Sequence, residues 1–331
     1  MINRIIDKLK REYRSFLYSI GKEQSLYRPT RNKVILCYHG VDLSNRRDFN
    51  YRFISQADFK ATLEYLKKRF TVVDAEEIFD LPDNDGKQYV AITFDDGYVN
   101  NLKYAKPVLE ELQVPATFYI TAIREENKEI LWADAIDILS FYADQPFKLD
   151  GHTFTKTAYG KLHCESLNQG LNPYVKALPF DRKYEVIAQL KDHVKADPFS
   201  DPKNADYWEL VTKEQIKECA DSAYVSVGTH SHKHNNLADI DFDAAKQEIA
   251  FSKTYLEEII KKPVRSIAYP DGSYTREVGD YCTSIGIDKQ YAVSYLHKED
   301  EQDPKVLDRL GLYPDRSVIE QLHQINQEFC K

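Results

Sequence analysis

Long apolar runs are absent from this sequence, since none approaches the ~18 consecutive apolar residues that a membrane-spanning helix needs. The first residues also lack the continuous apolar core of a secretory signal peptide, because charged residues recur through the first fourteen positions. We therefore expect a cytoplasmic protein, with peripheral attachment to the inner face of the membrane as a further hypothesis.

Cysteine is scarce and scattered. The chain of 331 residues has five cysteines, an odd number, and none of them forms a C-x-x-C pair. This pattern argues against a disulfide framework and against a cysteine-built zinc site, and it fits a reducing compartment.

An overall excess of positive charge is also missing, because the formal net charge is −8. That value disfavours a nucleic-acid partner. The charge is uneven, however: residues 1–33 contain nine Lys or Arg against three acidic residues, which leaves −14 on the remainder. Apolar residues repeat at the helical period through residues 2–20. We expect a helix packed on its own domain or on another subunit, with an interfacial helix on an anionic membrane as the alternative.

From residue 33 onward, short apolar runs alternate with amphipathic stretches that predict helices, such as one capped by Ser55. Alternation of this kind predicts a parallel sheet covered by helices, either a barrel or an open sheet. In both folds, chemistry gathers at the carboxyl ends of the strands. Strands are expected near residues 34–38, 70–73, 89–94, 116–120, 224–227, 267–269 and 291–294.

Residues 122–223 interrupt this alternation. The range contains two expected helices, near 132–142 and 181–194, around a polar middle. We therefore divide the chain into an N-terminal helix and arm over 1–30 and a barrel domain over 31–331 that carries the insertion. An insertion of this size between two strands is a candidate cap over the site, and caps often determine specificity.

Two adjacent carboxylates, Asp95 and Asp96, directly follow the expected strand at 90–94. Buried carboxylates are costly unless a positive group holds them. An Asp-Gly pair is also a common turn, so this motif by itself leaves a purely structural reading open.

Three of the nine histidines fall within five residues, in the segment GTHSHKH at 228–234. If a helical turn follows the strand, His230 and His234 share one face and can share a metal, whereas His232 points elsewhere. One carboxylate and two histidines give three protein ligands with open positions, which is the layout of a catalytic metal site. The other carboxylate is then free to act as general base on a water that the metal acidifies.

A third strand end carries the segment SIAYPDGSY at 266–274. Its simple reading is a strand followed by a Pro-Asp-Gly turn. Its functional reading is a loop formed by Tyr269, Pro270 and Asp271, in which a backbone N–H near Asp271 faces the oxyanion of a tetrahedral intermediate.

Taken together, these motifs resemble the signatures of the polysaccharide deacetylases, carbohydrate esterase family four. TFDDG at 93–97 resembles the first signature, H-S-x-x-H at 230–234 the second, and Y-P-x-G at 269–272 a variant of the third. The likeness covers roughly residues 33–125 and 222–315. It also includes YHGV at 38–41, VPATF at 114–118 and LDR at 307–309.

The resemblance implies a distorted (β/α) barrel of seven strands, here with a large, mostly helical insertion. It assigns Asp95 as general base, and Asp96, His230 and His234 as ligands of one divalent metal ion. Zinc is the expected ion, with cobalt, nickel or manganese as alternatives. The implied reaction hydrolyses the N-acetyl amide of an amino sugar, so the enzyme would act on carbon–nitrogen bonds other than peptide bonds. O-acetyl removal and deformylation of a lipid-linked sugar are related alternatives.

The sequence departs from the family pattern in its third signature. Ala268 stands where fuller signatures have an arginine, so the arginine beside the base must come from elsewhere. Arg309 is our first candidate and Arg265 our second. Asp271 stands where a tyrosine usually precedes the glycine, and a backbone donor would survive that change.

The late signature that supplies a histidine general acid is also missing, so the sequence leaves the acid unassigned. His39, at the end of the first strand, is a candidate acid or substrate contact, or else a core histidine. His297 and His323 are further candidates that lack the surrounding pattern.

We expect a metal-dependent deacetylase whose substrate is an acetylated amino sugar, a nucleotide sugar or a lipid-linked glycan of surface-polysaccharide assembly. The missing acid signature favours one alternative, a catalytically inactive carbohydrate-binding or assembly protein on the same barrel, but the intact Asp95–Asp96 pair argues against it. A phosphoesterase is disfavoured because the motifs lack a Lys/Arg cluster for phosphate. A lipid-linked substrate would suit peripheral membrane contact through residues 1–20.

Overall fold

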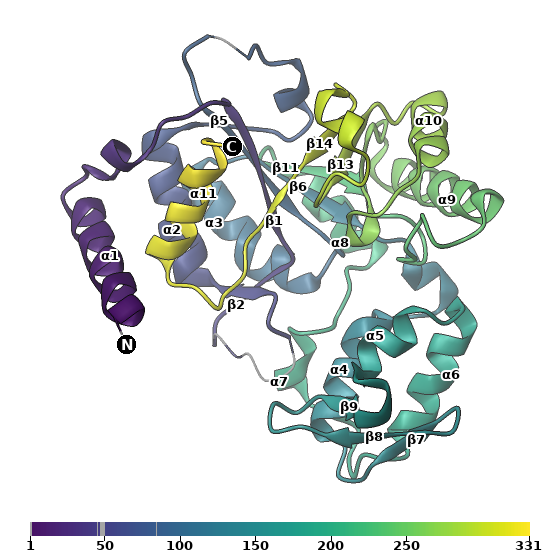
Figure 1. The fold of residues 1–331 in the computed structure, drawn as a ribbon. Helices are drawn as coiled ribbons and strands as arrows, with labels where there is room; N and C mark the ends of the chain where they lie inside the picture. The colour runs from purple at the N-terminus through teal and green to yellow at the C-terminus, as the bar shows by residue number, and fades with distance from the viewer. Residues whose placement is uncertain (1, 45, 47–49, 84) are drawn as a thin grey trace.

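Parallel strands form the centre of the molecule, and helices surround them (Figure 1). The computed structural model describes residues 2–44, 46, 50–83 and 85–331. Within this part of the chain, eight parallel strands follow one path, in the order β14-β13-β12-β11-β6-β5-β1-β15. They are β1 (Lys33–Tyr38), β5 (Tyr89–Phe94), β6 (Ala116–Ile120), β11 (Val225–Thr229), β12 (Ser266–Ala268), β13 (Lys289–Ala292), β14 (Val306–Asp308) and β15 (Leu310–Gly311).

The two ends of this path meet at Arg309, the single residue between β14 and β15. β14 pairs with β13, whereas β15 pairs with β1. The segment 306–311 therefore acts as one interrupted strand that closes the sheet into a barrel. Counted this way, β14 and β15 are a single strand and the barrel has seven, which confirms the predicted fold. A further strand, β4 (Thr71–Val73), pairs with the first half of β5, and β6 pairs with its second half. This split is one source of the barrel's distortion.

Alternation along the strands separates the inner core from the outer one. In β5, Val90, Ile92 and Phe94 pack in the large cluster beneath the helices. Tyr89 and Ala91 instead join a cluster of residues from neighbouring strands that fills the barrel interior. Side chains at the inward positions near the carboxyl ends of the strands are thereby directed toward one end of the barrel.

Helices surround the barrel, and the one predicted to begin after Ser55 is among them. Ser55 caps α2 as expected, since its hydroxyl accepts a hydrogen bond from the Asp58 amide at 3.1 Å. The surrounding helices are α2 (Gln56–Arg69), α3 (Lys106–Leu112), α8 (Lys213–Ala220), α9 (Phe242–Ile260), α10 (Arg276–Ser284) and α11 (Val318–Glu328).

The insertion forms a separate lobe with its own apolar core (Figure 1). Helices α4 (Trp132–Tyr142), α5 (Leu171–Lys176) and α6 (Phe180–Lys191) pack against a four-stranded antiparallel sheet that the sequence did not predict. Its strands are too short to show a clear alternation: β7 (Phe147–Leu149), β8 (His152–Lys156), β9 (Leu162–Cys164) and β10 (Gln169–Gly170). α8 lies within the predicted range 122–223 but packs in the barrel core, so the lobe is shorter than that range.

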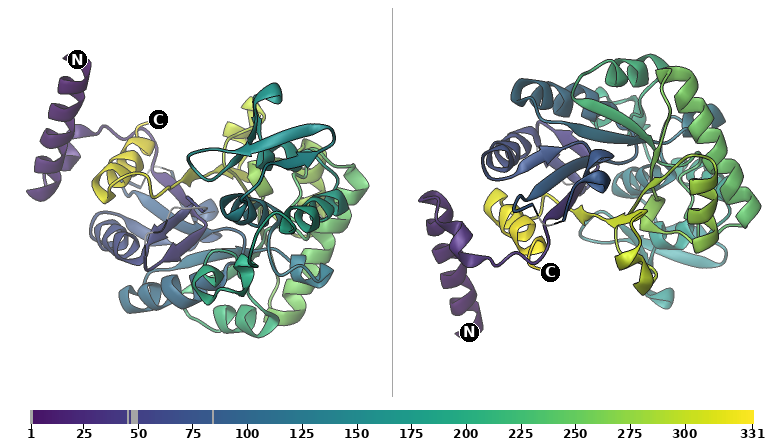
Figure 2. Two further views of the ribbon diagram at one scale, coloured as in Figure 1. Left: turned by 90° about the horizontal axis from the view of Figure 1, so that it is seen from below. Right: turned by 90° about the horizontal axis from the view of Figure 1, so that it is seen from above.

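At the start of the chain, α1 (Ile2–Ser19) lies at the edge of the molecule beyond α2 and α11 (Figure 2). The insertion lobe lies on the other side of the barrel (Figure 1). Across the part of the chain that the structure describes, no helix is both long enough and apolar enough to span a membrane.

Candidate active site

The carboxyl ends of neighbouring strands bring the predicted residues to one edge of the barrel. His39 follows β1, Asp95 follows β5, His230 follows β11 and Asp271 follows the end of β12. These four side chains, with His234, line a pocket of about 640 Å³ whose opposite wall comes from the insertion lobe. The site is therefore built between the barrel and the lobe.

A tight turn after β5 separates the two adjacent carboxylates. Asp96 and Gly97 both adopt positive φ angles, of 77° and 85°. A Cβ atom at Gly97 would lie 2.9 Å from Cγ2 of Ile120, so only glycine fits there. The turn directs the Asp95 side chain toward Arg309 and the Asp96 side chain toward the histidines.

Asp96, His230 and His234 converge on one point. Oδ1 of Asp96 lies 3.4 Å from Nε2 of His230 and 3.0 Å from Nε2 of His234. The helical turn on which the i, i+4 pairing was conditional does not form, because residues 230–234 are a loop in which Ser231 and His234 have positive φ angles. The loop nevertheless brings the two imidazole rings to a centroid distance of 5.0 Å. His230 and His234 therefore both face Asp96, although a loop and not a helical turn brings them together.

The protonation of these groups fits a bound cation. Nδ1 of His230 lies 2.7 Å from the Ala268 carbonyl oxygen, which can only accept a hydrogen bond, so Nδ1 carries the proton. In the neutral ring, Nε2 then presents a lone pair to Oδ1 of Asp96, which is buried and receives no hydrogen bond from the described residues. Two facing lone-pair donors are unfavourable unless a cation lies between them, and such orientation of a ligating histidine by a carbonyl is common at metal sites.

Electrostatics keep Asp96 ionised despite its burial. Burial opposes the charged form, but His230, His234 and Arg52 hold the pKa of Asp96 well below its usual range. An anionic oxygen beside two imidazole nitrogens is a donor set that suits zinc and related divalent ions.

Asp95 is held by a buried, bidentate ion pair. Nη1 and Nη2 of Arg309 each lie 2.7 Å from one oxygen of the Asp95 carboxylate. Burial alone would raise the pKa of Asp95, but the charge of the Arg309 guanidinium lowers it to about 2. Arg309 is thus the arginine at this carboxylate, whereas Arg265 pairs with the exposed Asp288.

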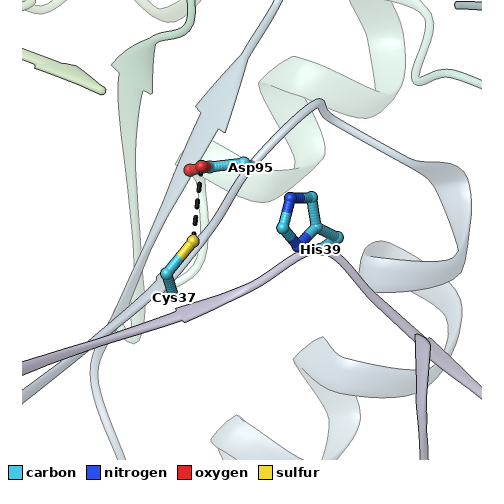
Figure 3. A group of neighbouring side chains, drawn as sticks. All are labelled: Cys37, His39 and Asp95. Atoms are coloured by element: carbon cyan, nitrogen blue, oxygen red, sulfur yellow. Dashed lines mark hydrogen bonds between the residues drawn. The ribbon is translucent and has the colours of Figure 1, made fainter. Parts of the chain in front are cut away.

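Cys37 and His39 lie beside Asp95 (Figure 3). The Cys37 thiol donates to Oδ2 of Asp95 over 3.4 Å. These three side chains could in principle ligate an ion, but both oxygens of Asp95 are already bonded to Arg309, so the Asp96 group fits a cation better. Burial, with the nearby charge of Arg52, lowers the pKa of His39 to about 4, and its ring is therefore neutral near pH 7.

Of the three predicted residues in the loop after β12, only Asp271 lines the pocket. The Tyr269 side chain is fully buried, donates to Gln290 at 2.5 Å and stacks on Tyr274, so it belongs to the core. Pro270 is buried beside it. Asp271 has a positive φ of 56° and lines the pocket, where its carboxylate lies 2.9 Å from Nζ of Lys176 on α5.

His232 takes no part in this cluster, as the sequence predicted, but it is buried and not on the surface. Its ring stacks on Phe251 at a centroid distance of 4.0 Å. Nε2 of His232 lies 3.3 Å from Glu126, away from Asp96. This histidine therefore provides a matched control for the two that meet Asp96.

Sequence reasoning missed Arg52 and Asp134. Nη1 of Arg52 lies 3.3 Å from Oδ2 of Asp96, and Nη2 lies 2.6 Å from Oδ1 of Asp134 on α4 of the lobe. Tyr98 and Asn50 also donate to the Asp134 carboxylate, at 2.5 and 3.2 Å. The sequence signal was a pair of acidic residues, Asp134 and Asp137, in a largely apolar helix segment, WADAIDILSFY.

The sequence profile of the family described as polysaccharide deacetylase matches residues 83–179 and 180–289, well over half of the chain. The chain belongs to the polysaccharide deacetylase family. Asp95, Asp96, His230 and His234 all fall within the matched ranges. This deacetylase is accordingly a hydrolase that acts on carbon–nitrogen bonds other than peptide bonds. No curated protein sequence matches it.

Solved structures share the fold of the deacetylase at low sequence identity. The deacetylase PplD from Streptococcus pyogenes, determined with acetate, has a TM-score of 0.57 at 16% identity, over 90% of this chain and 99% of PplD. A polysaccharide deacetylase from Bacillus cereus gives 0.54 at 20% identity, over 90% and 69%. IcaB from Ammonifex degensii gives 0.52 at 19% identity, over 90% and 98%. These likenesses support the barrel architecture.

Proposed function

We propose that this deacetylase is a metal-dependent enzyme that removes the N-acetyl group from an amino sugar of a surface glycan or its precursor. The observation that supports this most is the meeting of Asp96 with His230 and His234, two histidines that line the pocket together with an ionised Asp95. Asp96 and the two histidines would hold one divalent ion, zinc being the best match to a carboxylate–imidazole donor set. When bound, the ion would acidify a water molecule and polarise the acetyl carbonyl.

Asp95 has the position and charge of the general base. Because Arg309 fixes both carboxylate oxygens and keeps them ionised, Asp95 is ready to accept a proton from the attacking water. The carboxylate that takes the proton of the attacking water is also the group that can return it to the leaving amine. We therefore assign both proton transfers to Asp95.

His39 suits substrate contact better than proton donation. Its pKa of about 4 leaves no imidazolium proton to donate at neutral pH. Nδ1 of His39 is buried without a hydrogen-bond partner among the described residues, and the side chain lines the pocket. A sugar hydroxyl or the acetamide group would satisfy that nitrogen. Asp271 contributes through its backbone, whose N–H we assign to the developing oxyanion.

The pocket volume of about 640 Å³ lies within the range of small-molecule sites, and accommodates a sugar ring with its acetamide group. Trp132, Leu171 and Pro173 line the wall that the lobe contributes. Apolar and aromatic walls of this kind suit the faces of sugar rings. Nucleotide-linked sugars, lipid-linked sugars and free glycans can all carry an acetamide group. Comparing the rates of acetate release from these three classes identifies the substrate.

Removal of the metal is the direct test of this proposal. Metal-loaded protein should release acetate from N-acetylglucosamine oligomers, chelation should abolish the release, and added zinc should restore it. Metal content measured in parallel should fall in His230→Ala and His234→Ala but stay at the wild-type level in His232→Ala, because only the first two face Asp96.

Other outcomes identify the alternatives. Release of formate, or of acetate from O-acetylated sugars alone, would replace N-deacetylation by deformylation or O-deacetylation. Tight metal binding without acyl release from any of these sugars would favour a catalytically inactive carbohydrate-binding protein. Acetate release that survives complete metal removal would contradict the metal-dependent mechanism.

The contact between Arg52 and Asp134 makes the insertion lobe part of the metal site. Nη1 of Arg52 lies 3.3 Å from Oδ2 of Asp96, so the positive charge of Arg52 is close to the expected cation site. Asp134 balances that charge through its ion pair with Arg52. We expect Asp134→Asn to weaken zinc binding by about 10–100-fold, as loss of groups that orient metal ligands does elsewhere. Competition with a chromophoric chelator measures this affinity without an activity assay.

Asp137→Asn is the matched control for this prediction. Asp137 lies on the same helix and lines the same pocket, but its carboxylate is 2.8 Å from Lys161 and not at Arg52. Equal zinc affinity in wild type and Asp134→Asn would show that the lobe does not support the ligand carboxylate.

A further inference from the structure

The first helix carries an apolar stripe that the protein itself leaves uncovered. Ile6, Leu9, Tyr13, Phe16 and Ile20 follow one another at spacings of three and four residues, which places them on one side of a helix. Each side chain is between 42% and 59% exposed. The stripe extends over about 21 Å at 1.5 Å per residue. Large apolar patches of this kind on a protein surface mark interaction sites.

Among the described side chains of α1, the hydrogen bonds to the body lie near the C-terminal end of the helix. Leu17 is buried, and the Tyr18 hydroxyl forms hydrogen bonds with Tyr27 at 3.0 Å and with Asn326 at 3.2 Å. Both ribbon views show the rest of α1 projecting from the edge of the molecule (Figures 1 and 2). The stripe therefore faces away from the barrel and remains available to an external partner.

Charge identifies the partner. Lys8, Lys10 and Arg11 are exposed along the same helix, in a chain whose residues beyond 33 carry −14. The basic helix is thus attracted to an anionic surface, whereas pairing with the same helix of a second copy would bring like charges together. We propose that α1 binds the surface of an anionic lipid bilayer, with its apolar stripe at the headgroup–acyl boundary and its lysines and arginines among the headgroups.

This binding goes beyond the proposed hydrolysis and does not depend on it. Attachment through α1 would hold the enzyme at a membrane with the insertion lobe, which forms one wall of the active-site pocket, on the other side of the barrel from the helix (Figure 1). The bilayer is bound peripherally, since no described helix is suited to span it.

Vesicle co-sedimentation of the full chain tests the proposal. The wild type should pellet with vesicles that contain phosphatidylglycerol, pellet much less with pure phosphatidylcholine, and be released by high salt. The double variant Leu9→Asp/Phe16→Asp should lose at least tenfold in partitioning, because two charges then occupy the apolar stripe. Lys10→Glu/Arg11→Glu should lose the preference for anionic vesicles.

Tyr159→Asp is the control, because Tyr159 is a large aromatic side chain on the insertion lobe, away from α1, and is more exposed than any member of the stripe. It should bind vesicles like the wild type. Circular dichroism and acetate release from a soluble substrate should be unchanged in all these variants, which separates failure of this proposal from failure of the proposed function. Equal sedimentation of wild type and Leu9→Asp/Phe16→Asp would overturn the proposal. So would a dimer in light scattering that dissociates in that variant, since the stripe would then cover a second copy.

Discussion

Replacing Asp95 by asparagine should lower kcat for acetate release by about 10²–10⁴-fold, the range that a general base contributes. The amide keeps the shape of the carboxylate but cannot accept the proton of the attacking water. Zinc content should stay at the wild-type level, because Asp96 and the two histidines are untouched. Release of acetate by the metal-loaded variant, measured beside its metal content, checks both expectations.

Two controls make this result specific to the base. Cys37→Ala removes only a weak thiol hydrogen bond to Asp95 at 3.4 Å, so it should change kcat far less. Because asparagine also leaves Arg309 buried without its counter-charge, the folded fraction of Asp95→Asn must be measured at the assay temperature. A folded, metal-loaded Asp95→Asn with wild-type activity would assign the base to another residue.

Motifs at strand ends were readable from the sequence because their geometry is dictated by the parallel sheet. Asp95 and His230 each follow an apolar run, and carboxyl ends of parallel strands meet at one edge. The prediction of one shared site needed no knowledge of the loops. It therefore did not depend on the conditional helical turn at 230–234. Ser231 and His234 adopt left-handed backbone conformations there, and the segment forms a loop.

Contacts between segments far apart in the chain could not be predicted from the sequence. Arg52 and Asp134 are 82 residues apart in the chain, and only the docking of the lobe on the barrel brings them to 2.6 Å. The small sheet of the lobe was missed because its strands contain two to five residues, too few for periodicity to distinguish them from loops. Arg309 became a candidate partner of Asp95 only through the family resemblance. Its position beside Asp95 results from the closure of the barrel at 306–311, which the sequence did not reveal.

Replacing Arg309 by methionine should lower the free energy of unfolding by about 3–5 kcal/mol at neutral pH, the cost of leaving one member of a buried ion pair uncompensated. Arg309 is fully enclosed, between Tyr119 and Tyr291 in the barrel interior, so water cannot replace its two hydrogen bonds to Asp95. Chemical denaturation of the metal-loaded wild type and variant measures the difference.

The pH dependence of stability should reverse sign in this variant. In the wild type, the pKa of Asp95 is depressed to about 2, below the ~3.9 of an unfolded aspartate, so the pair stabilises the fold at higher pH and loses that effect as pH falls toward 2. Without Arg309, burial raises the pKa of Asp95 above the unfolded value. The carboxylate then destabilises the fold at neutral pH, and mild acid should relieve the penalty by protonating it.

The double variant Asp95→Asn/Arg309→Met separates this charge effect from lost packing. With both charges removed, most of the stability lost in Arg309→Met should return, since neutral groups of similar shape often replace a buried pair at little cost. A double variant as unstable as Arg309→Met would show that the guanidinium acts through packing against Tyr119 and Tyr291. Recovery would instead establish that Arg309 is held in the barrel to keep a buried base ionised, the role that an arginine at position 268 would otherwise have filled.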